Sequence, residues 1–268
     1  MPELPEMETY REFLNHNILH KTITNVEINR EKSINTGVQT FIEAVKGANI
    51  TFVKRRAKHL IFELSSGKFL LLHLMLGGLM FLGTTKNSPD RTKQIILSFG
   101  ELQLNFIGLR LGYLHLLSQV ELDEKLSDLG PEPFELQRDV FLDRLERKKG
   151  ALKPLLVDQS FIAGIGNCYS DEICFQARLH PLRKASDLKE EERNNLYDSI
   201  KPVLARAVQF GGYMDFPMYE GDEKTGRYNE NTYVYEREGE KCPRCGGTIE
   251  RVEHSYKSFY CPSCQMKV

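Results

Sequence analysis

Six cysteines occur in the chain, and four of them form two Cys-x-x-Cys pairs near its end, Cys242 with Cys245 and Cys261 with Cys264. In a reducing compartment such pairs bind metal rather than form disulfides. Each pair supplies half of a tetrahedral site, and four thiolates together are typical of zinc. Because protein ligands fill all four positions, the sequence predicts one structural Zn²⁺ ion in a two-stranded ribbon too small to fold without it.

The chain begins Met-Pro-Glu-Leu-Pro-Glu, which is an unusual start. Proline after the initiator Met permits removal of the Met, which leaves Pro2 with a free secondary amine. Proline and acidic residues suit a first helical turn, so a helix over residues 4–20 holds this amine beside Glu3 and Glu6. An α-amino group titrates near ~8, and an amine beside carboxylic acids is suited to Schiff-base chemistry. The alternative is an ordinary helix start with an inert, frayed terminus.

Length and composition predict a globular protein of one large domain or two, and two are favoured. The chain has 268 residues, of which 41% are hydrophobic, and a net charge of −1. This charge does not by itself indicate nucleic-acid binding, although a local basic face is compatible with a neutral total. The sequence has no run of about 18 apolar residues and no signal-peptide pattern, so we expect a cytoplasmic protein with no membrane contact.

Hydrophobic periodicity changes along the chain. Short alternating segments between residues 23 and 106 predict an antiparallel β-sandwich or barrel, interrupted by a helix at about 38–46. A cluster of Pro and Gly at residues 129–133 marks a boundary, after which the period is helical to about residue 210. The expected class is α+β, with a β-sandwich flanked by helices, a helical domain and a C-terminal β-ribbon. The predicted domains are residues 1–130, 131–232 and 233–268.

Two internal segments carry clustered positive charge. Residues 54–59 read Lys-Arg-Arg-Ala-Lys-His, which fits either a solvated edge strand or a phosphate-facing loop with one Lys directed into a site. Residues 150–167 predict a helix, a tight Gly turn and a second helix that starts near Asn167. Backbone N–H groups at such a turn bind phosphate, and several basic residues lie nearby, Lys153 among them.

Taken together, these segments resemble the formamidopyrimidine-DNA glycosylase and endonuclease VIII family of base-excision repair, and the formamidopyrimidine branch most closely. The resemblance spans essentially the whole chain and implies a helix–two-turn–helix domain between the β-sandwich and a zinc finger. The matching segments, in order, are Pro-Glu-Leu-Pro-Glu-x-Glu-Thr at 2–9, Arg-Arg-x-Lys at 55–58, Ala-Gly-Ile-Gly-Asn at 163–167 and the two Cys-x-x-Cys pairs.

The resemblance implies a bifunctional DNA glycosylase and AP lyase, a monomer that acts on double-stranded DNA with a damaged base or an abasic site. In the family the terminal proline nitrogen attacks C1′ of a nucleotide flipped out of the duplex, the base leaves, and β- then δ-elimination cuts the strand. Carried onto this chain, Pro2 is the nucleophile and Glu3 the acid that protonates the opening sugar. Glu6 helps to place the terminus, and Lys58 contacts phosphate and assists proton transfer.

Further residues are implied to contact DNA. Asn167 and its turn grip the phosphates of the damaged strand, and His73, Arg110 and Lys153 add contacts to the same surface. Lys257 lies near the place of a zinc-finger arginine in the segment 254–258. That match is loose, because lysine lacks the planar fork of arginine.

The residues that would read the bases depart from the family pattern. Leu76 stands where the branch has a Met that fills the space of the flipped base. Leu109 stands where an Arg pairs with the orphaned base, and Leu111 where a Phe wedges the stack. Leucine fills a gap but does not hydrogen-bond a base edge, so a strict opposite-base preference is not expected. Residues 213–220 also match poorly, which favours an altered lesion preference or, alternatively, a damaged-DNA-binding paralogue with little excision.

Overall fold

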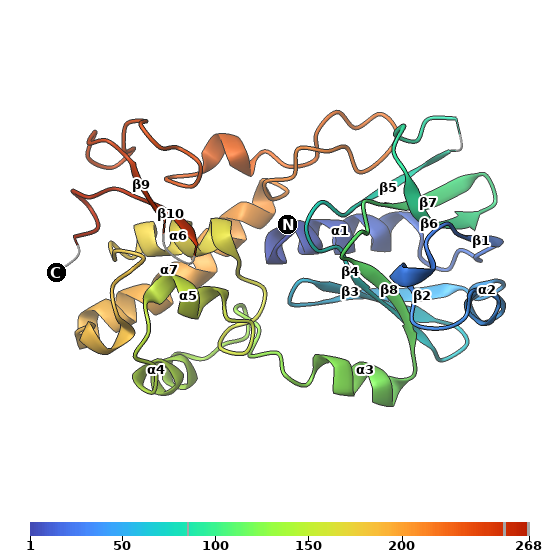
Figure 1. Ribbon diagram of the computed structural model, residues 1–268, viewed down its shortest axis with the longest axis horizontal. Helices are drawn as coiled ribbons and strands as arrows, with labels where there is room; N and C mark the ends of the chain where they lie inside the picture. Colours follow the sequence, from blue (N-terminus) through green and yellow to red (C-terminus); the bar gives the residue numbers. More distant parts are fainter. Residues whose placement is uncertain (85, 254–255, 267–268) are drawn as a thin grey trace. The chain divides into compact units, whose positions relative to one another are not determined.

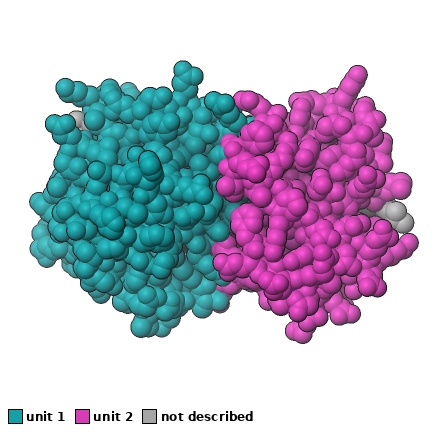
Figure 2. All heavy atoms as spheres, turned by 180° about the vertical axis from the view of Figure 1, so that it is seen from behind, with its two compact units in different colours: residues 1–127, 211–227 teal, residues 128–210, 228–268 magenta. Residues whose placement is uncertain are grey.

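The computed structural model describes residues 1–84, 86–253 and 256–266. The described chain divides into two compact units (Figure 2). Unit 1 contains residues 1–127 and 211–227, and unit 2 contains residues 128–210 and 228–268. The sequence placed residues 211–227 with the helical domain, whereas in the structure this segment packs within unit 1. No helix in the described ranges is long and apolar enough to cross a membrane.

Unit 1 is built from two four-stranded antiparallel sheets (Figure 1). One sheet has the order β1 (Asn25–Ile28), β6 (Lys93–Phe99), β7 (Leu102–Ile107) and β5 (Leu79–Thr84). The other has the order β2 (Ile50–Arg56), β3 (His59–Leu64), β4 (Phe69–His73) and β8 (Tyr113–Leu117). A 3₁₀ turn, Glu31–Ser33, and α2 (Val38–Val45) follow β1, and the predicted helix at 38–46 is thereby confirmed.

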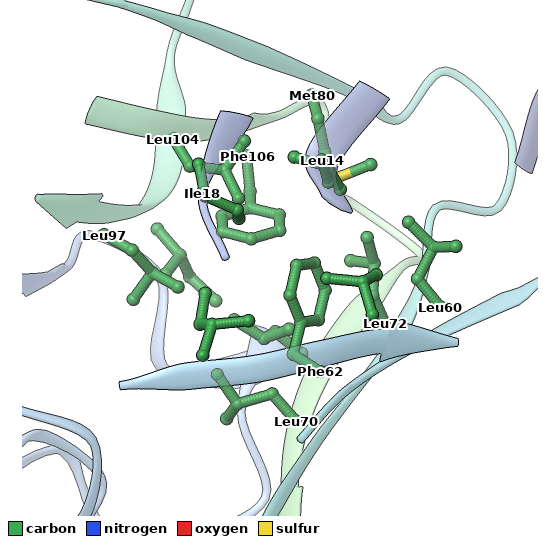
Figure 3. Packing of buried hydrophobic residues seen from close by; sticks show 14 of the residues in the cluster. Leu14, Ile18, Leu60, Phe62, Leu70, Leu72, Met80, Leu97, Leu104 and Phe106 are labelled. Carbon is green, nitrogen blue, oxygen red and sulfur yellow. The ribbon is translucent and has the colours of Figure 1, made fainter. Parts of the chain in front are cut away.

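The two sheets face each other across one hydrophobic core. Phe62 of β3 and Phe106 of β7 meet edge to face with ring centroids 6.4 Å apart (Figure 3). Such aromatic pairs add to the stabilisation that comes from burial itself. The outer face of the β2–β3–β4–β8 sheet is covered by α3 (Gln119–Leu126), where Leu122 packs on Ile61 and Leu71. Where α3 covers the sheet, both of its faces are buried and β4 is apolar up to His73, whereas β2 exposes Phe52 and Lys54.

Helix α1 (Leu4–Asn17) is attached to both sheets. The Tyr10 hydroxyl accepts a hydrogen bond from the Met80 N–H of β5 at 3.2 Å. The Asn15 side chain bonds both backbone groups of Val53 in β2, at 2.7 and 3.0 Å. The helix is shorter than the predicted 4–20, because the chain leaves the helical conformation after Asn17 and His20 has a φ of 61°. These attachments fix the position of α1 on the sheets, and Pro2 and Glu3 directly precede its first residue.

Unit 2 consists of helices and a small ribbon. Its helices are α4 (Arg138–Glu146), α5 (Leu152–Val157), α6 (Asn167–Gln176) and α7 (Glu190–Gln209), with 3₁₀ turns at Ala185–Asp187 and Tyr228–Asn231. The ribbon pairs β9 (Glu250–Glu253) with β10 (Lys257–Tyr260). In the α5–α6 turn, the Gln159 side chain accepts from the Gly164 N–H at 2.9 Å and donates to the Ile165 carbonyl at 2.8 Å. The second helix begins at Asn167, as predicted.

Two adjacent buried carboxylates of α6 hold the ribbon region. Glu172 accepts hydrogen bonds from the backbone N–H groups of residues 233–235 at 2.8 to 3.0 Å and from the Tyr228 hydroxyl at 3.2 Å. Asp171 accepts from the Phe259 N–H of β10 at 3.0 Å. Buried carboxylates need such partners, because an uncompensated charge in the interior is costly. Hydrogen bonds from α6 therefore hold both residues 233–235, which precede the zinc ribbon, and strand β10 of the ribbon.

Candidate active site and zinc centre

The N-terminus of α1 is held by the side chain of Glu6. One carboxylate oxygen, Oε2, accepts from the Glu3 N–H at 2.7 Å, and the other, Oε1, accepts from the Tyr213 N–H at 3.0 Å. Gly212 permits this approach, since a Cβ there would lie 2.2 Å from Glu6 Oε1, and its φ of +73° also favours glycine. Glu6 therefore connects the start of the chain with the segment that follows α7.

Lys58 lies in the tight turn between β2 and β3 and is only 5% exposed. Burial lowers its pKa, while the charges of Glu3 and Glu6 act in the opposite direction. The turn is held by Arg55, whose Nε donates to Glu8 of α1 at 2.7 Å. Lys58 and the two carboxylates are therefore close enough to interact electrostatically. The structure brings together the Lys and Glu residues that the sequence assigned to catalysis.

A pocket of about 150 Å³ opens beside Pro2. Its walls are mostly apolar, and Glu3 itself is 2% exposed. The lining residues are Met1, Pro2, Tyr10, Gly77, Gly78, Leu79, Tyr213, Met214, Asp215 and Phe216. The Tyr213 hydroxyl donates to the Met1 carbonyl. While Met1 is attached, the Pro2 nitrogen is an amide, and only its removal gives the amine required of a nucleophile.

His73 lies in a cluster of rings on strands β3, β4 and β8 of the β2–β3–β4–β8 sheet. Its ring centroid lies 4.4 Å from that of His59 and 5.8 Å from that of Tyr113. Burial, assisted by the charge of Lys58, lowers the pKa of His73 to about 4. His73 is therefore neutral at physiological pH, and any contact with DNA is a hydrogen bond rather than an ion pair.

The two loops predicted to enter the base stack meet at one surface pocket of about 640 Å³. Leu76 and Leu111 line it and are 68% and 65% exposed, and Arg110 and Arg91 line it as well. Leu109 differs from the prediction, since it is fully buried in the hydrophobic core. The residue before it, Gly108, has a φ of +72°, and the Leu109 N–H donates to Gln94 Oε1 at 3.1 Å.

The four cysteines predicted to bind zinc converge. Their sulfur atoms lie within 4.8 Å of one another, with Cys242 and Cys264 at 3.9 Å and Cys245 and Cys261 at 3.5 Å. In a tetrahedron with Zn–S bonds of about 2.3 Å, the sulfurs would be about 3.8 Å apart. The donor set and its spacing therefore fit one Zn²⁺ ion with no open position.

Asn167 and Lys257 line a common pocket of about 370 Å³ in unit 2, together with Arg251. Asn167 is exposed at the first residue of α6, and the Lys257 side chain is 65% exposed at the start of β10. An α-helix N-terminus offers backbone donors and a positive dipole end to an anion. The predicted segment 254–258 is only partly described, because His254 and Ser255 lie outside the described residues.

Lys153 was predicted to contact DNA, but the structure places it in the interior. Its side chain is 0% exposed, and its ammonium lies 2.7 Å from Asp171 Oδ2. The same ammonium donates to the backbone carbonyl of Lys257. Lys153 therefore stabilises β10 through this hydrogen bond, and its buried charge is not available to phosphate. The sequence reasoning missed Asp171 and Glu172, although two acids inside an apolar helical stretch are a signal that buried partners must exist.

Lys153→Met is expected to destabilise unit 2 by about 3–5 kcal/mol, because it leaves the Asp171 carboxylate buried without its ion partner. Chemical denaturation monitored by circular dichroism measures this. The double variant with Asp171→Leu should recover part of the loss, since apolar replacement of both partners is close to neutral. Lys149→Met at an exposed lysine is the control and should change stability by less than about 0.5 kcal/mol. If Lys153→Met and Lys149→Met lowered the free energy of unfolding by the same amount, the assignment of Lys153 to a buried ion pair would be wrong.

Comparison with known proteins agrees with this architecture over the whole chain. Residues 1–113 match the formamidopyrimidine-DNA glycosylase N-terminal domain, residues 129–215 match the H2TH domain of that enzyme, and residues 239–265 match a zinc finger found in FPG and IleRS. A formamidopyrimidine-DNA glycosylase of Pelotomaculum thermopropionicum is 36% identical over 273 residues, 99% of each chain. The corresponding protein of Lactococcus lactis subsp. lactis is 33% identical over 276 residues, 100% of each chain.

The solved structures that resemble the chain include DNA complexes. The Lactococcus lactis Fpg bound to DNA containing an abasic site is similar with a TM-score of 0.93 and 31% sequence identity, over 99% of this chain and 100% of that one. Its complex with Fapy-dG-containing DNA is similar with a TM-score of 0.91 and 30% identity, over the same shares. The sequence matches and the fold agree, and the chain belongs to the formamidopyrimidine-DNA glycosylase family.

Proposed function

We propose that the protein is a bifunctional DNA glycosylase and AP lyase of base-excision repair, with Pro2 as nucleophile. The observation that supports this most strongly is the placement of Pro2 beside an apolar pocket, with Glu3 buried next to it and Lys58 within electrostatic reach. An amine, a carboxyl group and an ammonium beside a largely apolar pocket are groups suited to Schiff-base chemistry at a sugar carbon.

The reaction starts after removal of Met1. The lone pair of the Pro2 nitrogen attacks C1′ of the extruded nucleotide, and the C1′–N bond to the base breaks. The base leaves with the bonding electrons and takes up the proton that the secondary amine of Pro2 releases when its bond to C1′ forms. Glu3 protonates the sugar ring oxygen as the ring opens, which gives an iminium between Pro2 and C1′. Loss of a C2′ proton then expels the 3′ phosphate, and a second elimination expels the 5′ phosphate.

Glu6 and Lys58 have supporting roles in this scheme. Glu6 holds the Glu3 N–H and the Tyr213 N–H on its two oxygens, so it positions the terminus without touching substrate. Lys58 is only 5% exposed, and its ammonium form would attract phosphate more strongly there than in solvent. Asn167 and Lys257 contact the phosphates of the damaged strand from unit 2, and the protein acts as a monomer.

The preference for lesion and opposite base differs from that of an enzyme that reads bases with arginine. Leu76 and Leu111 are exposed apolar side chains able to fill a gap in the base stack. Leu109 is buried and has no hydrogen-bonding group to offer an orphaned base. We therefore expect excision rates that vary by less than about tenfold between the four opposite bases, which corresponds to less than ~1.4 kcal/mol.

The test is single-turnover excision from a panel of duplexes that carry oxidised purines, ring-opened purines, oxidised pyrimidines or an abasic site, each opposite all four bases. Base release followed by strand cleavage on at least one lesion class supports the proposal. Tight binding to lesion duplexes without base release or cleavage by protein that begins at Pro2 would favour the alternative, a damaged-DNA-binding paralogue.

Lys257→Met is expected to reduce the slope of log affinity against log salt by about one, because each phosphate contact releases roughly one counterion. Binding to a lesion duplex measured by fluorescence anisotropy at several salt concentrations gives the slope. Lys46→Met, at an exposed lysine directly after α2, serves as the matched control and should leave the slope unchanged. A slope that is the same for the Lys257 variant and the unaltered protein would show that Lys257 makes no phosphate contact.

A further inference from the structure

The Tyr213 side chain ends beside the nitrogen that becomes the nucleophile. Its hydroxyl donates to the Met1 carbonyl, and the carbon of that carbonyl is bonded to the Pro2 nitrogen. Tyr213 and Pro2 also line the same pocket. Removal of Met1 puts hydrogen in the place of the carbonyl carbon, so an N–H of the Pro2 amine would point toward the Tyr213 hydroxyl. The contact with Met1 is lost at that step, and the amine takes its place.

The backbone of Tyr213 is fixed on the same site. Its N–H donates to Glu6 Oε1 at 3.0 Å, and Glu6 Oε2 accepts from the Glu3 N–H at 2.7 Å. In the next residue, Met214, the carbonyl accepts from the Gly226 N–H at 3.0 Å, and the side chain is buried in the core of the sandwich. None of these contacts involves the first residue, so its removal leaves the backbone of Tyr213 in place.

The proposed reaction requires a proton to move at this point. The Pro2 nitrogen must release a proton when its bond to C1′ forms, and the base that leaves must gain one. Glu3 gives its proton to the sugar oxygen in the same scheme, and both carboxylate oxygens of Glu6 already accept backbone N–H groups. A positioned side chain that carries the proton between the nitrogen and the base would lower the barrier of this step.

Three of the described residues that line the pocket have a side chain able to transfer a proton, namely Tyr10, Tyr213 and Asp215. The Tyr10 hydroxyl accepts from a backbone N–H of β5 at 3.2 Å and is buried in the core. Asp215 pairs with Lys224 at 3.3 Å, and an ion-paired carboxylate has no proton to give. A tyrosine hydroxyl can accept a proton on a lone pair while it gives up its own. Tyr213 is therefore the residue of this pocket that is suited to a relay.

We propose that Tyr213 is a catalytic residue that relays a proton from the Pro2 nitrogen to the departing base. The inference rests on the proposed glycosylase function and adds a residue to it. When the lone pair of the Pro2 nitrogen forms the bond to C1′, the nitrogen becomes a cation whose N–H bonds to the Tyr213 oxygen. That oxygen takes the proton while the hydroxyl gives its own proton to the base, which leaves with the electrons of the C1′–N bond. Tyr213 is a neutral hydroxyl before and after the step.

An abasic site distinguishes this role from a structural one. Its sugar has already lost the base, so the group that leaves during Schiff-base formation is water, and solvent can supply the proton. A relay to the base is therefore needed for base release and not for reaction with an abasic site. A residue that only positioned Pro2 through Glu6 would be needed equally for both substrates.

The experiment compares variants that begin at Pro2. Tyr213→Phe keeps the ring and the backbone N–H that Glu6 accepts, and it removes only the hydroxyl. Tyr219→Phe is the matched control, since Tyr219 lies in the same segment, is 43% exposed, stacks on Phe13 and does not line the pocket. Single-turnover base release is measured on the lesion duplex from which the unaltered protein releases base fastest. The rate of borohydride trapping is measured on a duplex with a natural abasic site.

The proposal predicts that Tyr213→Phe lowers the rate of base release by about 10²-fold, the lower end of the usual contribution of a positioned proton-transfer group. The same variant should trap on the abasic site at a rate within about twofold of the unaltered protein, and Tyr219→Phe should leave both rates within about twofold. Equal losses on the two substrates would show that Tyr213 only positions the terminus. That result, or base release that Tyr213→Phe does not slow, would overturn the relay.

The unaltered protein tests the proposed function in the same assays. If it traps on the abasic site and releases base, and Tyr213→Phe does both equally fast, only the relay is overturned. If the unaltered protein, shown to begin at Pro2, neither traps nor releases base from any lesion duplex, the proposed glycosylase–lyase function is overturned together with the relay.

Discussion

Glu3→Gln is expected to lower the single-turnover rate of base excision by about 10²–10⁴-fold, the usual contribution of a positioned general acid. Glu3 is 2% exposed, and its backbone N–H is fixed on Glu6 at 2.7 Å, so the substitution removes the proton donor with little change in shape. Rapid-quench measurement of base release from a lesion duplex gives the rate. The effect should appear in the chemical step and not in the affinity for DNA.

Glu12→Gln is the matched control for this variant. Glu12 lies on the same helix, α1, with its side chain 62% exposed, and it does not line the pocket beside Pro2. It should leave the excision rate within about twofold, because surface substitutions away from a site have small effects. If Glu3→Gln excised bases as fast as the control, another group would have to protonate the sugar and the assignment of Glu3 would be wrong.

Loss of the zinc site has the second large expected effect. Cys261→Ala removes a fully buried ligand, and the ribbon then loses the metal that provides most of its folding free energy, about 10–16 kcal/mol for such sites. Lys257 stands on that ribbon, so DNA affinity should fall by roughly tenfold to a hundredfold. Metal content by mass spectrometry and DNA binding by anisotropy measure the two consequences together.

The sandwich should survive this change, because its core contains no residue of the ribbon. Cys168→Ala, at a buried cysteine of α6 outside the metal cluster, is the matched control and should keep one zinc ion per chain. Chelation followed by zinc readdition should reverse the loss of affinity in the unaltered protein. If metal-free protein bound lesion DNA as tightly as the zinc form, the ribbon would have no part in DNA binding.

Much of the fold could be predicted from periodicity. The segments at β2, β3 and β7 contain short apolar runs that end at glycine or charged turns, and such runs predict strands. Two other strands have weak signals in the sequence. In β5 (Leu79–Thr84) five consecutive residues are buried, so the segment has no alternation to mark it as a strand. In β8 (Tyr113–Leu117) the pattern is short, and only pairing with β4 identifies it. Such strands are defined by their neighbours rather than by their own sequence.

The zinc site was predicted well, because four thiolates at this spacing leave few alternatives and the four cysteines do converge, whereas the role of Pro2 stays a prediction. Burial was harder to predict. Lys153 looked like a phosphate ligand because lysine is normally exposed, and its buried partner Asp171 lies 18 residues further along the chain. Leu109 and Leu111 are two residues apart, yet one is in the core and the other is 65% exposed. Between them the chain makes a tight turn, in which the Arg110 N–H donates to the Gly108 carbonyl at 2.7 Å, and sequence periodicity does not predict such a turn.

The most direct test of the central claim is borohydride trapping on a duplex with an abasic site, followed by mass mapping of the adduct. Protein whose N-terminus has been shown by mass to be Pro2 is predicted to form a covalent complex, with the sugar remnant attached to the peptide that begins at Pro2. A fraction that retains Met1 has an amide nitrogen at that position and should give no adduct there. An adduct on a lysine instead, or no adduct with the trimmed protein, would contradict the claim that Pro2 is the nucleophile.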